Sequence, residues 1–133
     1  MSKPAYSYIR DPAEIYRQSF AAIRRETDLS RLDEDLTPVA LRLVHACAMP
    51  EIVDDLAASP DAARAGRDAL AGGAPILTDV EMVARGVIAN RLPQENDVIC
   101  RLGDPSITNL AASQNTTRSA AAVTLWPDQL AGA

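Results

Sequence analysis

The stretch that decides the fold is Ala74-Pro75-Ile76-Leu77-Thr78-Asp79-Val80-Glu81-Met82-Val83. Residues 76–78 form a short apolar run bounded by breakers, which predicts a buried strand, and Asp79 is expected to cap the helix that follows. A second apolar run at residues 97–102 predicts another strand. Strands separated by helices favour parallel β-α-β organisation, with ligands beyond the carboxyl ends of the strands. Thr78 stands at such an end.

Helix signals surround this strand pair. Asp11 and Pro12 supply a cap and a first helical residue for an amphipathic helix. Thr37-Pro38 repeats the signal for a helix that is apolar nearly all round and is therefore expected to be buried. Residues 6–10 are a candidate third strand, without which the sheet has only two. Further helices are predicted to begin at Pro50 and near Ser59, the latter ending at Gly72-Gly73, and to occupy residues 117–125.

The composition indicates one folded domain. The chain has 133 residues, of which 47% are hydrophobic and 23% charged, as in ordinary globular proteins. The net charge of −5 argues against a general nucleic-acid binder, because neutralising phosphates needs a surplus of Lys and Arg. No apolar run reaches membrane-spanning length and the N-terminus lacks a signal-peptide pattern, so a cytoplasmic protein without membrane contact is expected.

Few residues in the chain can carry chemistry. Cys47 and Cys100 have no Cys or His at metal-ligand spacing, so both are expected to be small buried hydrophobic residues and no metal site is predicted. Nucleophile-elbow, dinucleotide-binding and Walker patterns are absent from the sequence. His45 is the only histidine, and composition alone leaves two readings open for it, a hydrogen-bonded core residue or a catalyst.

The other candidates also have a structural and a functional reading. A serine inside a helix, such as Ser19, often only bonds to a carbonyl one turn earlier. Arg118 follows two threonines at a predicted helix start, where its guanidinium and backbone N–H groups can receive a carboxylate, or it is a surface charge. Asp79 and Glu81 can be a carboxylate pair near the site or simply the start of a helix.

Five blocks of sequence together resemble the N-terminal part of the precorrin-8X methylmutase family. They follow in the family's order and span nearly the whole chain. The blocks are Tyr8-Ile9-Arg10-Asp11 with Ile15-Tyr16 and Ser19-Phe20, Leu43-Val44-His45-Ala46-Cys47, residues 74–83, Val98-Ile99-Cys100, and Thr117-Arg118-Ser119-Ala120-Ala121.

The resemblance implies a fold and an activity. The expected fold is α/β, a helix-rich three-layer flavodoxin-like arrangement around a parallel sheet, with residues 1–133 forming one methylmutase domain that is truncated at its C-terminus. The expected activity is that of a cobalamin-pathway isomerase, which moves a methyl group from C-11 to C-12 of precorrin-8X to give hydrogenobyrinic acid, or acts on the cobalt-containing equivalent. The resemblance also implies a tetrapyrrole substrate, a homodimer and no cofactor.

The resemblance assigns roles to four residues. His45 matches the family's proton donor and acceptor, and Ser19 matches a serine that contacts the substrate. Arg118 and Thr78 are expected to bind the substrate as well. An imidazole suits this chemistry, because protonating the macrocycle makes it electron-poor and eases methyl migration. The alternative is a tetrapyrrole-binding or assembly module without turnover, or an inactive fragment.

Overall fold

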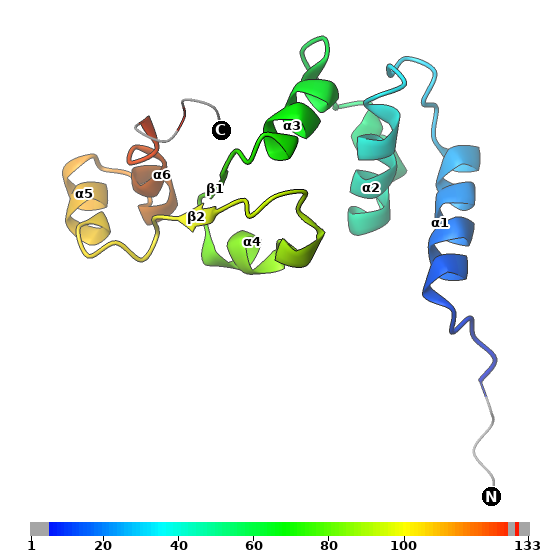
Figure 1. Cartoon of the computed structure of the whole chain (residues 1–133), viewed down its shortest axis with the longest axis horizontal. Coiled ribbons are helices and arrows are strands. Elements are labelled where there is room, and N and C mark those ends of the chain that lie inside the picture. The colour runs from blue at the N-terminus through cyan, green and yellow to red at the C-terminus, as the bar shows by residue number, and fades with distance from the viewer. Residues whose placement is uncertain (1–5, 128–129, 131–133) are drawn as a thin grey trace, which may run out of the picture. The chain divides into compact units, whose positions relative to one another are not determined.

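The structure is a computed structural model that describes residues 6–127 and 130. It divides into two compact units, Met1–Arg64 and Ala65–Ala133, each of which has its own packing (Figure 1). Both units are rich in helix, and the second contains a small parallel sheet. The predicted α/β class is confirmed, whereas the organisation of residues 1–133 as one domain stays a prediction.

The first unit begins with helix α1 (Pro12–Glu26), and its start is the predicted one. The Asp11 carboxylate accepts a hydrogen bond from the Ala13 N–H, and Pro12 occupies the first turn, where a missing N–H costs nothing. Arg24 and Arg25 lie in the last turn, where positive charge interacts favourably with the helix dipole.

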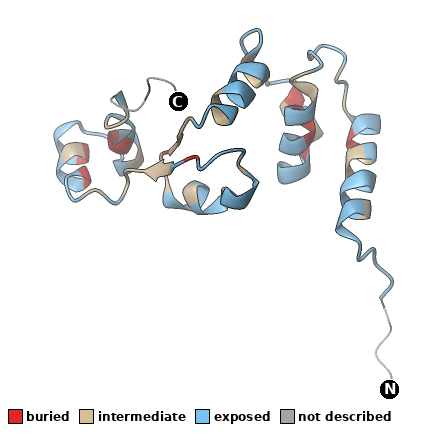
Figure 2. Ribbon diagram, viewed as in Figure 1, coloured by how far each residue is buried: buried red, intermediate tan, exposed pale blue. Residues whose placement is uncertain are grey.

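Helix α2 (Thr37–Cys47) packs against α1, and the short 3-10 helix η1 (Pro50–Val53) packs against α2. Ala48 ends α2 in the left-handed conformation, with φ of 56°. The Arg31 guanidinium donates to the Val53 carbonyl and lies 3.6 Å from the Asp54 carboxylate. Five side chains form the core of this unit, and they are Ile23, Ala40, Leu41, Val44 and Val53 (Figure 2).

The prediction that α2 is buried nearly all round is wrong. Ala40, Leu41 and Val44 are buried, but Leu43 and Cys47 on the same helix are exposed. Helices α1 and η1 pack on the face of α2 that carries its buried residues, while Leu43 and Cys47 reach solvent.

Helix α3 (Ala62–Ala71) leads into the second unit and ends as predicted at the glycine pair. Gly73 has φ of 87°, a conformation that L-residues with a Cβ rarely adopt. The Gly73 N–H donates to the Leu70 carbonyl and the Ala74 N–H to the Ala69 carbonyl, so the last carbonyls of the helix are satisfied. This turn sends the chain directly into the first strand.

Strands β1 (Ile76–Thr78) and β2 (Val98–Cys100) pair in parallel, as predicted. Ile76 is opposite Val98, and Thr78 is opposite Cys100. Helix α4 (Glu81–Gly86) and the 3-10 helix η2 (Ala89–Arg91) make the connection between the strands, and α4 contacts both of them. The two strands are the whole sheet within the described part of the chain, and residues 6–10, the candidate third strand, are not in a strand.

The prediction that Asp79 caps α4 is wrong. The N-cap is Val80, which is extended at φ of −138° and ψ of 146° and makes no side-chain cap hydrogen bond. The chain leaves β1 extended for longer than expected, which places the Asp79 carboxylate one residue too early to accept from the first turn.

Helices α5 (Ile107–Ser113) and α6 (Arg118–Val123) pack against each other at the end of the second unit. The Thr117 hydroxyl accepts from the Ala120 N–H at 3.1 Å, so the predicted helix start near Thr117 is confirmed. The buried contact is made by small and β-branched side chains, which are Ile107, Ala111, Ala121 and Ala122. Among the described residues, no helix is both long and apolar enough to span a membrane.

Both cysteine predictions need correction. Cys47 is exposed and Cys100 is half-buried, so neither is a fully buried hydrophobic residue. Cys47 lies at the C-terminal end of α2, and Cys100 ends the short strand β2 at the edge of an open hollow beside α4.

We predict that Leu41→Ala lowers the free energy of unfolding by about 2 to 5 kcal/mol, because it removes a buried side chain and leaves a cavity. Leu41 is 3% exposed, whereas Leu43 on the same helix is 37% exposed. Leu43→Ala is therefore the matched control, with an expected loss of less than about 1 kcal/mol. Urea unfolding measures both, and equal losses would contradict the packing of α2.

A second prediction concerns Asn96, which is buried and holds the entry to β2. Its side-chain N–H groups donate to the Leu70 carbonyl at 2.9 Å and the Ala74 carbonyl at 2.8 Å. Asn96→Asp replaces these donors by a carboxylate that faces two carbonyl oxygens, so we expect a loss of more than about 2 kcal/mol at neutral pH.

The loss in the free energy of unfolding caused by Asn96→Asp should become smaller at acidic pH. Two facing carbonyls raise the folded-state pKa of the introduced carboxyl above its unfolded value, because the protonated form can donate one hydrogen bond. A raised carboxyl pKa means that the penalty is fully present above the folded pKa and is relieved below the unfolded one. Urea titrations at several pH values measure this, with Asn90→Asp, an exposed site in η2, as the control. A penalty independent of pH would count against the hydrogen bonds of Asn96.

Candidate functional site

His45 lies in the last turn of α2 and faces α1. Its Nδ1 is 2.8 Å from the Ser19 hydroxyl oxygen. The imidazole is exposed rather than enclosed in the core, although its neighbour Val44 is 2% exposed. Of the two readings that composition left open, the structure therefore disfavours a buried core histidine and leaves the ring accessible to a ligand.

Two aromatic side chains of α1 lie against the same imidazole. The Tyr16 ring centroid is 5.1 Å from that of His45 with the planes tilted by 39°, and the Phe20 centroid is 5.5 Å away with the planes at 89°. Tyr16, Ser19 and Phe20 are three and four residues apart, so they share one face of α1. One face of α1 thus supplies His45 with a hydrogen bond and with two aromatic neighbours, one tilted against the imidazole and one perpendicular to it.

A shallow hollow of about 210 Å³ opens beside this cluster. Such a volume is below that of a typical small-molecule pocket, so the hollow by itself does not enclose a ligand of that size. Its lining combines the imidazole, a carboxylate and small apolar groups from α1, α2 and the turn after α2. The lining residues are Ser19, Ala22, Ile23, Glu26, Val44, His45, Ala48 and Pro50.

Charged groups on α1 and α2 flank the site. The Arg42 guanidinium lies 5.9 Å from the centre of the Phe20 ring, within the range of a cation–π contact. Arg17 is engaged elsewhere, because its Nε donates to Glu14 at 2.7 Å. The hydrogen bond from Arg17, followed by that from Gln18, holds the pKa of the Glu14 carboxyl below its ordinary value. Arg17 and Glu14 therefore form an ion pair with each other rather than with a ligand.

Thr78 and Arg118 both belong to the second unit. Thr78 ends β1 as predicted, but it is 4% exposed and its hydroxyl donates to the Ile99 carbonyl at 3.4 Å. Arg118 is the first residue of α6 and is exposed, and its guanidinium has no ion-pair partner within the part of the chain that the structure describes. Arg118 is thus free to receive an anion, whereas the Thr78 hydroxyl already has a partner.

The Glu81 carboxylate has a partner on its own helix. Glu81 lies 3.7 Å from Arg85, one turn along α4, whereas Asp79 does not cap the helix. No group of three or more His, Cys, Asp and Glu side chains able to hold a metal ion occurs in residues 6–127 and 130.

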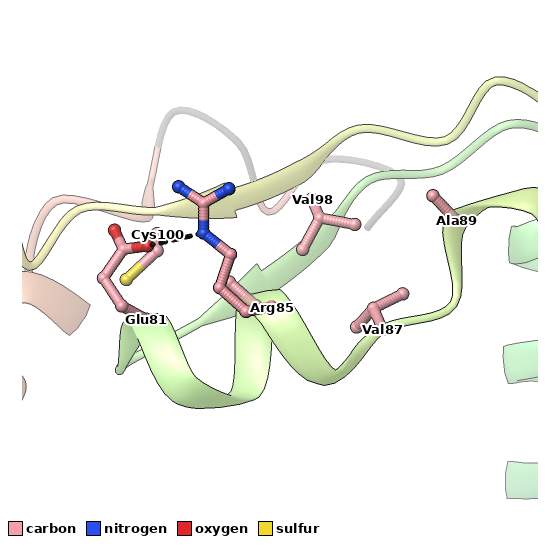
Figure 3. A pocket seen from close by; sticks show the side chains of 7 residues that line it. Glu81, Arg85, Val87, Ala89, Val98 and Cys100 are labelled. Carbon is pink, nitrogen blue, oxygen red and sulfur yellow. Dashed lines mark ion pairs between the residues drawn. The ribbon is translucent and has the colours of Figure 1, made fainter.

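A second hollow, of about 470 Å³, was not predicted from the sequence. Figure 3 shows the Glu81–Arg85 ion pair beside Cys100, with Val87, Ala89 and Val98 along the same side. The i, i+4 spacing of Glu81 and Arg85 predicts their pairing, but nothing in the sequence predicts that the end of β2 faces them.

The structure brings together Ser19 and His45, which the sequence proposed separately, within the first unit. The sequence analysis names Tyr16 and Phe20 only within the blocks that carry the resemblance, and it does not predict their contact with His45. Their spacing from Ser19 on one helix face was the signal that could have found them.

Comparisons with known proteins agree on one family. The family model for precorrin-8X methylmutase matches residues 14–133. The precorrin-8X methylmutase of Sinorhizobium sp is 53% identical over 129 residues, covering 97% of this chain and 61% of that protein. The corresponding protein of Pseudomonas aeruginosa is 51% identical over 125 residues, covering 94% of this chain and 60% of that protein.

A solved structure of precorrin-8X methylmutase from Thermus thermophilus superimposes with a TM-score of 0.74 at 32% sequence identity, covering 91% of this chain and 59% of that chain. The chain therefore spans about three fifths of the length of the relatives it matches. Because a family model covers most of the chain and both the sequence and the fold agree with it, this chain belongs to the precorrin-8X methylmutase family.

Proposed function

We propose that this chain is part of a cobalamin-pathway isomerase that moves a methyl group from C-11 to C-12 of precorrin-8X, or of its cobalt-containing equivalent. The observation that carries the proposal is the accessible His45 imidazole, held by Ser19 at 2.8 Å in a chain of this family. An exposed, oriented imidazole is the group that reversible protonation at neutral pH requires.

His45 acts as the proton donor and acceptor in this proposal. Proton transfer from the imidazolium makes the conjugated macrocycle electron-poor, so that the methyl group can migrate to the neighbouring carbon, after which the imidazole recovers the proton. No cofactor enters these steps. The rest of the rate acceleration comes from holding a rigid ring in the geometry in which it rearranges.

Substrate binding is assigned to Ser19, Thr78 and Arg118. The substrate is a tetrapyrrole that carries carboxylates, and the unpaired Arg118 guanidinium suits a carboxylate through two parallel hydrogen bonds. Thr78 is placed at a strand end but needs to exchange its hydrogen bond to the Ile99 carbonyl for one to the substrate. We further propose that the enzyme is a cytoplasmic homodimer.

We expect His45→Ala to lower conversion of precorrin-8X at least about a hundredfold, since it removes the only imidazole in the chain. The visible spectrum distinguishes the outcomes, because turnover changes the chromophore with time whereas binding alone gives a saturable, stoichiometric shift. Cys47→Ala, at an exposed site on the same helix, is the control and should convert normally.

Retained turnover in the His45→Ala variant would remove His45 from the mechanism. A saturable shift without conversion by the unaltered chain would instead support the alternative of a tetrapyrrole-binding or assembly module. Far-ultraviolet circular dichroism of each variant confirms that α2 is intact.

A separate prediction addresses Arg118. Arg118→Ala should weaken tetrapyrrole binding about tenfold or more, because a hydrogen-bonded charge pair contributes roughly 1.5 to 3 kcal/mol. Arg118→Lys should recover only part of the affinity, since an ammonium cannot make two parallel bonds to one carboxylate. Absorbance titration measures the affinities, and Arg91→Ala in η2 is the control with the same change of charge. Equal affinities for Arg118→Ala and Arg91→Ala would make Arg118 an ordinary surface charge.

A further inference from the structure

The two ring nitrogens of His45 are in different surroundings. Nδ1 is 2.8 Å from the Ser19 hydroxyl oxygen. Nε2 has no hydrogen-bond partner among the residues that the structure describes, and the ring as a whole is exposed. Nε2 is therefore available to a ligand that approaches the imidazole, whereas Nδ1 already has Ser19 as its partner.

The Ser19 hydroxyl can serve both charge states of the imidazole. A serine within a helix commonly donates to a carbonyl one turn earlier, but the hydrogen bond of Ser19 in the structure goes to His45 instead. A hydroxyl carries one donor and two acceptor lone pairs. Its oxygen can therefore accept from Nδ1–H when the ring is charged, and also when the neutral ring keeps its proton on Nδ1.

The hydrogen bond of Ser19 selects one orientation of the imidazole. Tyr16 lies at 39° to the imidazole and Phe20 at 89°, and a half-turn of the ring within its own plane leaves both of these ring contacts nearly unchanged. A half-turn of the imidazole would place a carbon against Ser19 and lose the hydrogen bond at Nδ1. Ser19 thus favours one orientation of the ring.

We propose that His45 gives up and recovers its proton through Nε2, and that Ser19 is the positioning residue that holds Nδ1 in both charge states. The inference rests on the proposed function for its catalytic meaning. In the forward step the Nε2–H bond breaks, its electron pair stays on Nε2, and the proton passes to the macrocycle. The neutral ring keeps its proton on Nδ1 and still donates it to the Ser19 oxygen, and the reverse step returns a proton to Nε2.

The same geometry leaves the Ser19 hydroxyl able to contact the substrate. Because the Ser19 oxygen accepts from Nδ1–H in both charge states, its own O–H is free to donate to an acceptor on the substrate. Ser19 can therefore hold the ring and bind the substrate at the same time, which joins its positioning role to its proposed substrate-binding role.

Nuclear magnetic resonance of the protein without substrate tests the positioning directly. Because His45 is the only histidine, the imidazole ¹⁵N signals report a single ring. In the alkaline range where the ¹⁵N shifts no longer change with pH, we expect Nδ1 to be protonated and Nε2 to carry the free lone pair. Compared with the same chain unfolded in urea, the separation of the two ¹⁵N shifts should move toward that of a ring protonated at Nδ1. A folded protein protonated mainly at Nε2 would overturn the proposal without any variant.

Variants then assign the effect to Ser19. Ser19→Ala should bring the shift separation at least about halfway to the unfolded value, because the partner of Nδ1 is lost. Ser19→Thr keeps the hydroxyl and should restore the separation. Ser113→Ala is the matched control, since the Ser113 hydroxyl bonds the Leu110 carbonyl of its own helix. An unchanged separation in Ser19→Ala would show that Ser19 does not orient the ring.

Kinetics separate positioning from simple binding. If Ser19 positions the imidazole, Ser19→Ala should lower kcat about tenfold or more while KM changes less, and Ser19→Thr should recover kcat. A rise in KM with kcat unchanged would make Ser19 only a substrate contact. If the shifts behave as expected but no form of the chain converts precorrin-8X, the proposed function fails while the orientation of His45 stands.

Discussion

The contact between α1 and α2 is the constraint on which the candidate site depends. Ile23 from α1 and Leu41 and Val44 from α2 are buried together, which fixes the distance and rotation of the two helices. His45 follows the buried Val44 directly, and Ser19 lies one turn before the buried Ile23. The hydrogen bond between Ser19 and His45 therefore joins residues 26 positions apart as a consequence of apolar packing.

The last turn of α2 contains a buried residue next to an exposed one. Val44 is 2% exposed while the next residue reaches solvent, so the same helix turn anchors the core and presents the imidazole. The αL turn at Ala48, whose N–H donates to the Val44 carbonyl at 2.8 Å, ends α2 and lines the hollow beside His45. A rigid support of this kind is what a proton-transfer group needs, since its usefulness depends on its orientation.

The strand pair of the second unit is held in part by polar side-chain contacts. Its two strands are three residues each, too short to be stable alone, and the buried Asn96 amide ties their entry to the end of α3 through the Leu70 and Ala74 carbonyls. Thr78 continues the same pattern by bonding the Ile99 carbonyl across the strand pair. The strand end that carries a proposed substrate residue is therefore held by side-chain hydrogen bonds.

The sequence by itself determined the local elements, because caps, prolines, glycines and short apolar runs act over a few residues. Asp11, Thr117 and Gly73 behave as predicted for that reason, and the strands at Ile76 and Val98 pair in parallel. Only the tertiary structure decided that Asp79 misses its helix, that Cys47 is exposed, and that Tyr16 and Phe20 lie against His45. These outcomes depend on how separate segments pack, and the pattern within one segment does not specify which of its faces a distant segment will cover.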